Sequence, residues 1–120
     1  MARFLMVARD AGDMSAIVGD VSPEEIQEIL NKYSAWSEKL AKQGRLQGGE
    51  KLADGEGRVL AANSGSVRVT DGPHAASKEV IGGFWILTAD SYEEAVKLAS
   101  DCPHLEFGTL EIRQIEEMPA

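Results

Sequence analysis

The sequence predicts an α+β fold in a single domain that spans residues 1–120. A chain of 120 residues is long enough for one hydrophobic core and too short for two large domains. Two segments combine helical spacing of apolar residues with N-terminal capping residues, which is typical of amphipathic helices. Several short apolar or alternating segments, separated by turn residues, have the pattern of β-strands.

The first predicted strand covers residues 4–8, where every side chain is apolar. Both alternating sets of this strand are apolar, so we expect both of its faces to be covered. Residues 10–20 are rich in Gly and Asp and are predicted to form a loop.

The first helix is predicted over residues 23–43. Ser22 can cap it, Pro23 suits the first helical position, and Glu25 completes a capping box. Apolar residues then repeat at helical spacing from Ile26 to Leu40, with Leu30 on the stripe expected to be buried.

Three predicted strands follow, over residues 46–53, 58–62 and 66–70. The turns between them are rich in Gly, Asp, Asn and Ser. Because these turns are short, we expect the three strands to form a meander.

The rest of the chain is predicted to form a strand, a helix and a final strand. The strand covers residues 80–88, with apolar residues on both faces at 84–87. Asp90 or Ser91 caps the second helix, which ends near Cys102-Pro103. The last strand covers residues 109–115, where apolar and charged residues alternate.

Without the inserted strands of the meander, this order is βαββαβ, which predicts a ferredoxin-like plait. Two helices can cover only one face of such a sheet, yet the strands at 4–8 and 84–87 are apolar on both faces. We therefore expect a homodimer in which a symmetric partner buries the second face, around Phe84, Ile86 or their neighbours Trp85 and Leu87.

Charge and cysteine content restrict the possible partners and compartments. The chain has 12 basic and 20 acidic residues, for a net charge of −8, and the basic residues are scattered, so no direct nucleic-acid binding is expected. Cys102 is the only cysteine, which favours a reducing compartment. No segment has the length of a membrane span or of a signal-peptide core, so the protein is predicted to be cytoplasmic and not to bind membranes.

Residues 69–84 read Val-Thr-Asp-Gly-Pro-His-Ala-Ala-Ser-Lys-Glu-Val-Ile-Gly-Gly-Phe. This segment resembles the signature of the DGPF subgroup of the YCII-related family, which runs Val-Thr-Asp-Gly-Pro-Phe-Ala-Glu-Thr-Lys-Glu before a Gly-Gly-aromatic strand. Similar segments occur in the same order along nearly the whole chain: Ser22-Pro23-Glu24-Glu25, Gly48-Gly49-Glu50-Lys51-Leu52, Ala89-Asp90-Ser91, Cys102-Pro103 and Glu111-Ile112-Arg113.

The resemblance implies a dimeric α+β barrel, in which two ferredoxin-like sheets face each other, and no settled biochemistry. Some relatives are fused to, or encoded beside, extracytoplasmic-function sigma factors, and the broader YCII branch has been interpreted as enzymatic, with a His–Asp pair in a pocket. The sequence departs from the signature twice: His74 replaces Phe, and Ala76 replaces Glu.

Asp71 and His74 are the candidate catalytic residues, because a carboxylate three residues from an imidazole can orient the ring and raise its basicity. The alternative is that Asp71 opens a Gly-Pro turn and His74 lies at the surface. His104 follows a predicted helix end, where an imidazolium would interact favourably with the helix dipole. Cys102 and His104 do not have a recognised metal-ligand spacing, and we expect no metal and no cofactor.

Charged residues in or near the predicted strands are candidates for ligand binding: Glu50, Arg68, Lys78, Glu111 and Arg113. Alternation places Glu111 and Arg113 on one face of the last strand. Lys78 could hold an anionic ligand if it turns inward. The alternative for these residues is a solvated or ion-paired surface.

Three hypotheses for function follow from the sequence. The main one is a dimeric small-molecule-binding domain with a pocket near the Asp71–Lys78 segment. The second is a non-catalytic regulatory or interaction module linked to transcription, where a sigma-factor link rests on the resemblance alone. The third is an acid–base enzyme that uses Asp71 and His74.

Overall fold

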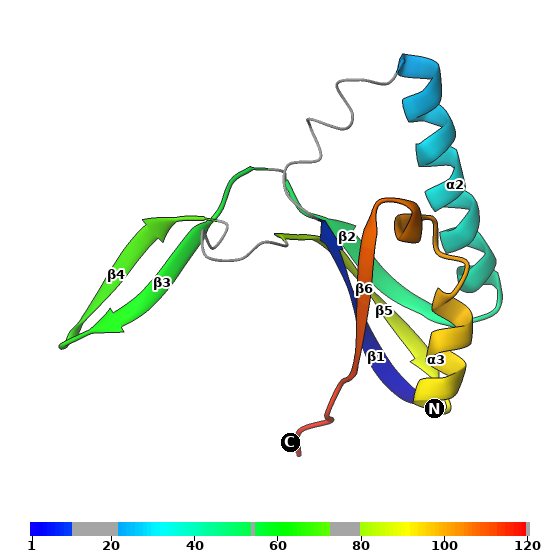
Figure 1. The fold of residues 1–120 in the computed structure, drawn as a ribbon. Coiled ribbons are helices and arrows are strands. Elements are labelled where there is room, and N and C mark those ends of the chain that lie inside the picture. The colour runs from blue at the N-terminus through cyan, green and yellow to red at the C-terminus, as the bar shows by residue number, and fades with distance from the viewer. Residues whose placement is uncertain (11–21, 54, 73–79, 120) are drawn as a thin grey trace.

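A computed structural model describes residues 1–10, 22–53, 55–72 and 80–119 of the chain. The described elements follow the predicted order, with one added 3₁₀ turn (Figure 1). They are β1 (Ala2–Asp10), α2 (Pro23–Lys42), β2 (Leu46–Lys51), β3 (Arg58–Asn63), β4 (Ser66–Asp71), β5 (Val80–Ala89), α3 (Tyr92–Ala99), η1 (Pro103–Glu106) and β6 (Gly108–Gln114).

The main sheet has four strands in the order β2-β5-β1-β6, and all of its pairings are antiparallel. Helices α2 and α3 lie on the same face of this sheet (Figure 1). This is the arrangement of a ferredoxin-like fold, so the α+β prediction is confirmed.

The hydrophobic core lies between the helices and the face of the sheet that they cover. Phe4 and Met6 of β1 and Leu87 of β5 are fully buried on this face. Trp36 and Leu40 of α2 pack against Met6 and Leu87, whereas Phe4 packs with Ala89 and Ala95. The alternating burial along β1 shows that consecutive side chains of this strand meet different surroundings on the two faces.

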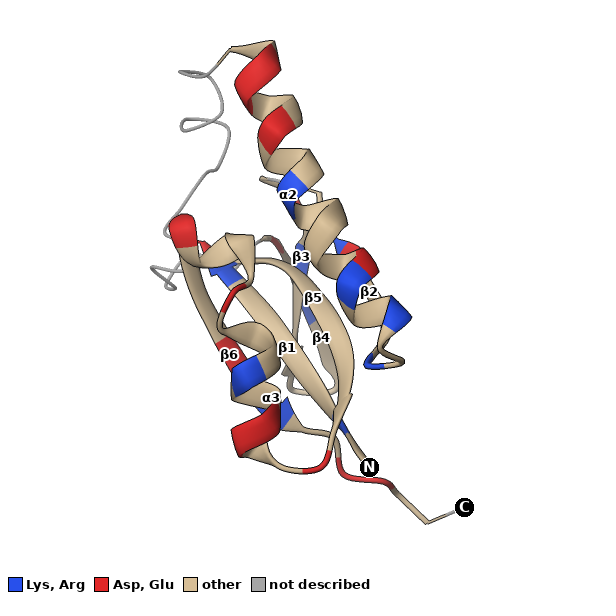
Figure 2. Ribbon diagram, turned by 90° about the vertical axis from the view of Figure 1, so that its right-hand side faces the viewer, with Lys and Arg blue, Asp and Glu red and all other residues tan. Residues whose placement is uncertain are grey.

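Helix α2 begins as the sequence predicts. The Ser22 hydroxyl accepts a hydrogen bond of 3.2 Å from the backbone N–H of Glu25. Acidic residues lie in the first turn and lysines in the last (Figure 2), which suits the helix dipole. The prediction of a buried Leu30 is wrong: this residue is 52% exposed, because the N-terminal half of α2 extends beyond the sheet (Figure 1).

The predicted meander of three strands is also wrong. Strand β2 pairs with β5 in the main sheet, whereas β3 pairs with β4 in a separate two-stranded hairpin. Gly55 and Gly57 both have positive φ, a backbone conformation that glycine adopts without steric cost. The chain therefore changes direction after β2, and the hairpin projects away from the main sheet (Figure 1).

The face of the main sheet opposite the helices is called the open face here. Its central side chains come from β1 and β5, where Leu5 pairs with Ile86 and Val7 pairs with Phe84. All four side chains are half-buried in the single chain. Of the four β5 residues named from the sequence, only Phe84 and Ile86 lie on this face, because Trp85 and Leu87 point toward the helices.

Candidate functional site

The predicted catalytic pair falls at the end of the hairpin. Asp71 is the last residue of β4, and its side chain is 92% exposed, 3.6 Å from Nη1 of Arg58. His74 lies outside the described residues, so the pairing of Asp71 with His74 stays a prediction. The surroundings of Asp71 are those of a solvated carboxylate.

The predicted ligand-binding residues are divided between the hairpin and the main sheet. Arg68 is exposed on β4. Glu50 is exposed on β2, where it pairs with Phe84 and so lies on the open face. Lys78 lies outside the described residues.

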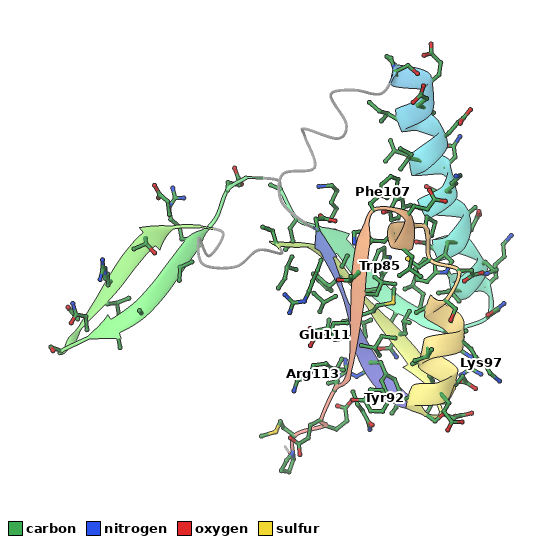
Figure 3. The ribbon with its side chains drawn as sticks, viewed as in Figure 1. Trp85, Tyr92, Lys97, Phe107, Glu111 and Arg113 are labelled. Carbon is green, nitrogen blue, oxygen red and sulfur yellow. The ribbon has the colours of Figure 1, made fainter. Side chains whose placement is uncertain are left out.

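Glu111 and Arg113 lie on the open face, opposite Val7 and Leu5 respectively (Figure 3). Glu111 forms an ion pair with Arg9, at 3.0 Å between Oε1 and Nη2. The structure thus brings Glu50, Glu111 and Arg113 to one face of the sheet, where they surround the apolar centre. These residues do not contact the groove described below.

A buried polar cluster lies on the other face of the sheet, and we call it the Asp10 cluster. It joins Asp10 at the end of β1, His104 in η1 and Tyr33 in α2. Asp10 and His104 are only 6% and 5% exposed. Nε2 of His104 lies 3.3 Å from Oδ1 of Asp10 and 3.1 Å from the carbonyl oxygen of Arg9, and Nδ1 lies 3.2 Å from the Tyr33 hydroxyl.

Two glycines make room for the Asp10 cluster. A Cβ atom on Gly82 would lie 2.3 Å from Oδ2 of Asp10. A Cβ atom on Gly108 would lie 2.1 Å from the carbonyl oxygen of Arg9 and 2.9 Å from Nε2 of His104. Contacts this short are not tolerated by side-chain carbon atoms. The Asp10 side chain therefore requires glycine at position 82, and the neighbouring backbone of β1 together with His104 requires it at position 108.

The tautomer of His104 follows from its partners. Burial raises the pKa of Tyr33 well above its usual range, and the nearby Cys102 and Asp10 raise it further. The Tyr33 phenol therefore stays protonated and can donate to Nδ1 of His104. The carbonyl oxygen of Arg9 can only accept a hydrogen bond, so Nε2 of His104 carries a proton and donates toward it and toward Asp10. The cluster therefore holds an oriented imidazole beside a carboxylate.

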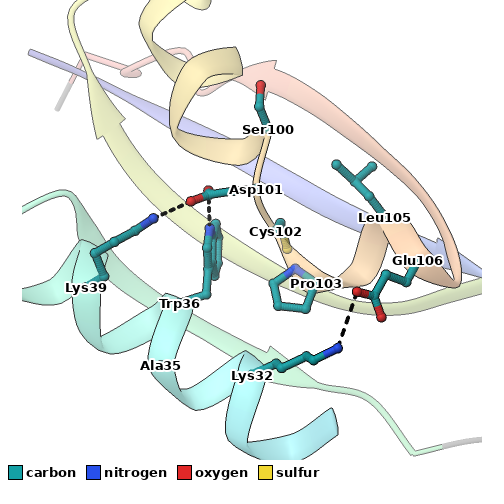
Figure 4. Close-up of a pocket in the computed structure, with 10 residues that line it drawn as sticks. All are labelled: Lys32, Ala35, Trp36, Lys39, Ser100, Asp101, Cys102, Pro103, Leu105 and Glu106. Atoms are coloured by element: carbon teal, nitrogen blue, oxygen red, sulfur yellow. Dashed lines mark hydrogen bonds and ion pairs between the residues drawn. The ribbon is translucent and has the colours of Figure 1, made fainter.

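A groove of about 610 Å³ lies between α2 and the connection from α3 to β6 (Figure 4). We call it the α2 groove. Its apolar lining consists of Ala35, Trp36, Cys102, Pro103 and Leu105. Two ion pairs connect its walls: Lys32 lies 3.5 Å from Glu106, and Lys39 contacts Asp101.

Asp101 has two side-chain partners in the groove, Lys39 and Trp36, whereas Glu106 pairs with Lys32. The hydrogen bond from Lys39 holds the pKa of Asp101 below its usual range, and the hydrogen bond from Trp36 Nε1, at 3.0 Å, lowers it further. Burial raises the pKa of the neighbouring Cys102 thiol to about 11. The α2 groove thus contains the protonated thiol of Cys102 and the carboxylate of Asp101, which is already bound by Lys39 and Trp36.

Local sequence patterns do not predict the Asp10 cluster or the α2 groove. They predict a loop at Asp10 and a helix-end position for His104. His104 instead turns inward to the sheet. The sequence does hold one signal for this region, the pair Gly82-Gly83 inside a predicted strand, because such glycines indicate close approach of another group.

The described ranges of the chain contain no group of three or more His, Cys, Asp and Glu residues arranged to hold a metal ion. No helix within these ranges has the length and apolar character needed to cross a membrane.

The four-stranded antiparallel sheet with two helices on one face defines a ferredoxin-like α+β protein. Over residues 2–119 the chain matches the family described as the YCII-related domain. The chain belongs to this family, and the resemblance observed in the sequence is confirmed at the family level.

Two individual proteins show the extent of the similarity. An uncharacterized protein of Rhizobium meliloti (strain 1021) is 29% identical over 97 residues, which is 78% of each chain. The solved structure of 5-chloro-2-hydroxyhydroquinone dehydrochlorinase from Burkholderia phenoliruptrix AC1100, in complex with 2,5-dihydroxybenzoquinone, has a TM-score of 0.46 and 19% identity to this chain. That similarity covers 97% of this chain and 95% of the other.

Proposed function

We propose that this protein is a homodimeric small-molecule-binding domain of the DGPF subgroup, and that its ligand occupies the α2 groove. The volume and lining of the groove support this proposal. Ligand sites commonly measure about 300–1,000 Å³ and combine an apolar lining with a few polar groups, and the α2 groove has about 610 Å³. The Asp71-Gly72-Pro73 sequence supports the subgroup.

The groove is a better ligand site than the Asp71–Lys78 segment. Asp71 is almost fully exposed, and residues 73–79 lie outside the described residues. In contrast, the groove has Trp36 at its floor and charged residues at each end (Figure 4). Trp36 is only 4% exposed, so Ala35, Pro103 and Leu105 provide most of the accessible apolar surface for a flat ligand.

The two ion pairs of the groove indicate the chemical class of the ligand. Asp101 accepts hydrogen bonds from both Trp36 and Lys39. Lys32 and Glu106 are about half exposed, and their atoms are 3.5 Å apart, so this pair contributes little to stability. A ligand carboxylate can replace Glu106 beside Lys32 at little cost. A small aromatic carboxylate fits these surroundings.

Binding of 2-naphthoate, followed by the NMR signal of the Trp36 indole N–H, tests the proposal. Ala35→Phe fills the groove from α2, whereas Ser34→Phe places the same ring on a neighbouring exposed position that does not line the groove. We expect wild type and Ser34→Phe to bind, and Ala35→Phe to lose about tenfold or more in affinity, equivalent to about 1.4 kcal/mol.

Lys32→Gln provides a second readout in the same titration. Loss of its charge should weaken binding of 2-naphthoate and leave binding of the neutral analogue 2-naphthol nearly unchanged. No shift of the Trp36 signal at millimolar ligand, or equal affinity in Ala35→Phe and Ser34→Phe, would rule out the groove as the binding site.

The open face supports the homodimer part of the proposal. Leu5, Val7, Phe84 and Ile86 form an apolar centre that the helices of the same chain do not cover. A second copy that presents the same face would bury both apolar centres and would give the dimeric α+β barrel implied by the resemblance.

An acid–base enzyme is the second candidate, and Asp10 with His104 supports it better than Asp71 with His74. A buried carboxylate that orients an imidazole is a common catalytic unit, and buried titratable pairs are frequent at functional sites. His104 lies in η1, next to Pro103 and Leu105 of the groove. The cluster therefore lies directly behind one groove wall.

His104→Gln separates this candidate from a structural role. Glutamine keeps a hydrogen-bond donor but cannot exchange a proton near neutral pH. If a groove ligand is converted, this variant should lose turnover and keep its affinity for the ligand. Equal loss of affinity and turnover would mean that the pair only holds η1 against the sheet. The regulatory module linked to transcription stays a prediction based on resemblance.

A further inference from the structure

We propose that the β3–β4 hairpin is an arm that packs its apolar face on a second copy of this chain. The proposal rests on the homodimer proposed above and goes beyond it, because it assigns part of the interface to a segment outside the main sheet. The partner that we expect on this face is the same protein.

One face of the hairpin is apolar and uncovered in the single chain. Leu60 pairs with Val69, and Ala62 pairs with Val67, so these four side chains share a face. Leu60, Val67 and Val69 are 64%, 60% and 56% exposed. Large apolar side chains gathered on one exposed face are typical of interaction sites.

The hairpin needs a packing partner for its own stability. It is a two-stranded sheet that forms no ladder with the main sheet, and an isolated hairpin is marginally stable in water. The N–H of Gly72 donates to the Gly57 carbonyl group at 2.9 Å and closes its base. Within the described residues, no core cluster includes a residue of β3 or β4.

The position of the hairpin indicates where its partner lies. It projects from the main sheet on the side opposite α2 and α3 (Figure 1). This is the side of the open face, to which Glu111 and Arg113 also point (Figure 3). A second copy that covers the open face would therefore lie within reach of the arm.

The area of the open face supports the same conclusion. Nine residues of β1 and four strands give a face of about 30 by 19 Å, or somewhat under 600 Å². A stable interface covers about 800 Å² per partner. The two six-residue strands of the hairpin add about 200 Å². The open face alone lies at the lower limit of standard interfaces, which is about 600 Å² per partner, and the hairpin would bring the contact close to the mean.

The two-fold symmetry of a dimer makes the arm contact reciprocal. Each chain would place its own arm on the other chain, so one substitution removes two equivalent contacts. Sedimentation equilibrium of the full chain measures this effect as the dissociation constant of the dimer. Circular dichroism of each variant verifies that the main sheet and the helices remain folded.

Val69→Asp and Thr70→Asp form a matched pair of variants. They introduce the same charge at neighbouring exposed positions, on the apolar face and on the opposite face of the hairpin respectively. We expect Val69→Asp to raise the dissociation constant of the dimer by about tenfold or more, since a carboxylate would be buried against the partner. Thr70→Asp should stay within about twofold of wild type.

Ile86→Asp on the open face separates failure of the arm from failure of the dimer. If Ile86→Asp weakens the dimer and Val69→Asp does not, the arm proposal is wrong and the dimer stands. If the wild-type protein is a monomer throughout the micromolar range, both are wrong. If Val69→Asp weakens the dimer and Thr70→Asp does not, the arm contacts the second copy as proposed.

Discussion

Side chains of the short turn η1 point to two different environments. Pro103 and Glu106 are three residues apart and line the α2 groove, whereas His104 faces Asp10. A 3₁₀ turn has about three residues per turn, so residues at this spacing lie above one another. One turn therefore supplies a groove wall on one side and the imidazole of the Asp10 cluster on the other.

Cys102 gives a prediction at the same scale. Burial raises the pKa of its thiol to about 11, and the thiolate is the form that reacts with iodoacetamide. Near pH 8, we expect alkylation of the native protein to be about a hundredfold or more slower than alkylation of the unfolded protein. The native rate should increase with pH toward 11, and equal native and unfolded rates would contradict the raised pKa.

The sign of the accompanying stability change is fixed by the same shift. The folded pKa of Cys102 lies above that of the unfolded thiol, which is about 8.5. The stabilising contribution is therefore complete below the unfolded pKa, and it decreases as the pH rises toward the folded value of about 11. Cys102→Ala should reduce this loss of stability in alkaline solution.

Helix α2 is held by its C-terminal half. Leu40 is 1% exposed, whereas Leu30 is 52% exposed. Leu40→Ala should lower the free energy of unfolding by about 2–5 kcal/mol, because it leaves a cavity in the core. Leu30→Ala should cost less than about 1 kcal/mol. Urea denaturation measures both values, and similar losses for the two variants would mean that α2 packs along its whole length.

Elements defined by local pattern could be predicted from the sequence, but the pairing of the middle strands could not. The Ser22 cap and the strand alternation depend on residues a few positions apart, and those predictions are confirmed. The partner of β2 depends on the whole sheet, because β5 returns beside it after the hairpin. The predicted burial of Leu30 is wrong because it also depends on the whole sheet. Helical spacing shows which residues share a stripe of α2, but it does not show where the sheet beneath the helix ends.

At the scale of the whole molecule, the fold is a sheet with one covered and one open face, and an arm that projects on the open side (Figure 1). The covered side holds both the α2 groove and the Asp10 cluster. Binding and assembly are thus assigned to opposite sides of the sheet. A dimer formed through the open face would leave the groove accessible.

The Asp10 cluster and the α2 groove could not be predicted from local sequence patterns. Asp10 and His104 come from opposite ends of the chain, and the groove joins the middle of α2 to η1. Local spacing instead predicts a catalytic pair of Asp71 and His74, which are only three residues apart. Strand alternation predicts that Glu111 and Arg113 share a face, and the structure places both on the open face together with Glu50.

A crystal structure of the protein with 2-naphthoate tests the central claim, that the α2 groove is the ligand site, most directly. We predict electron density for the naphthalene ring in the groove, against Ala35, Pro103 and Leu105, with the carboxylate within hydrogen-bond distance of Lys32 Nζ. Density beside Asp71 or on the open face, with an empty groove at saturating ligand, would contradict the account.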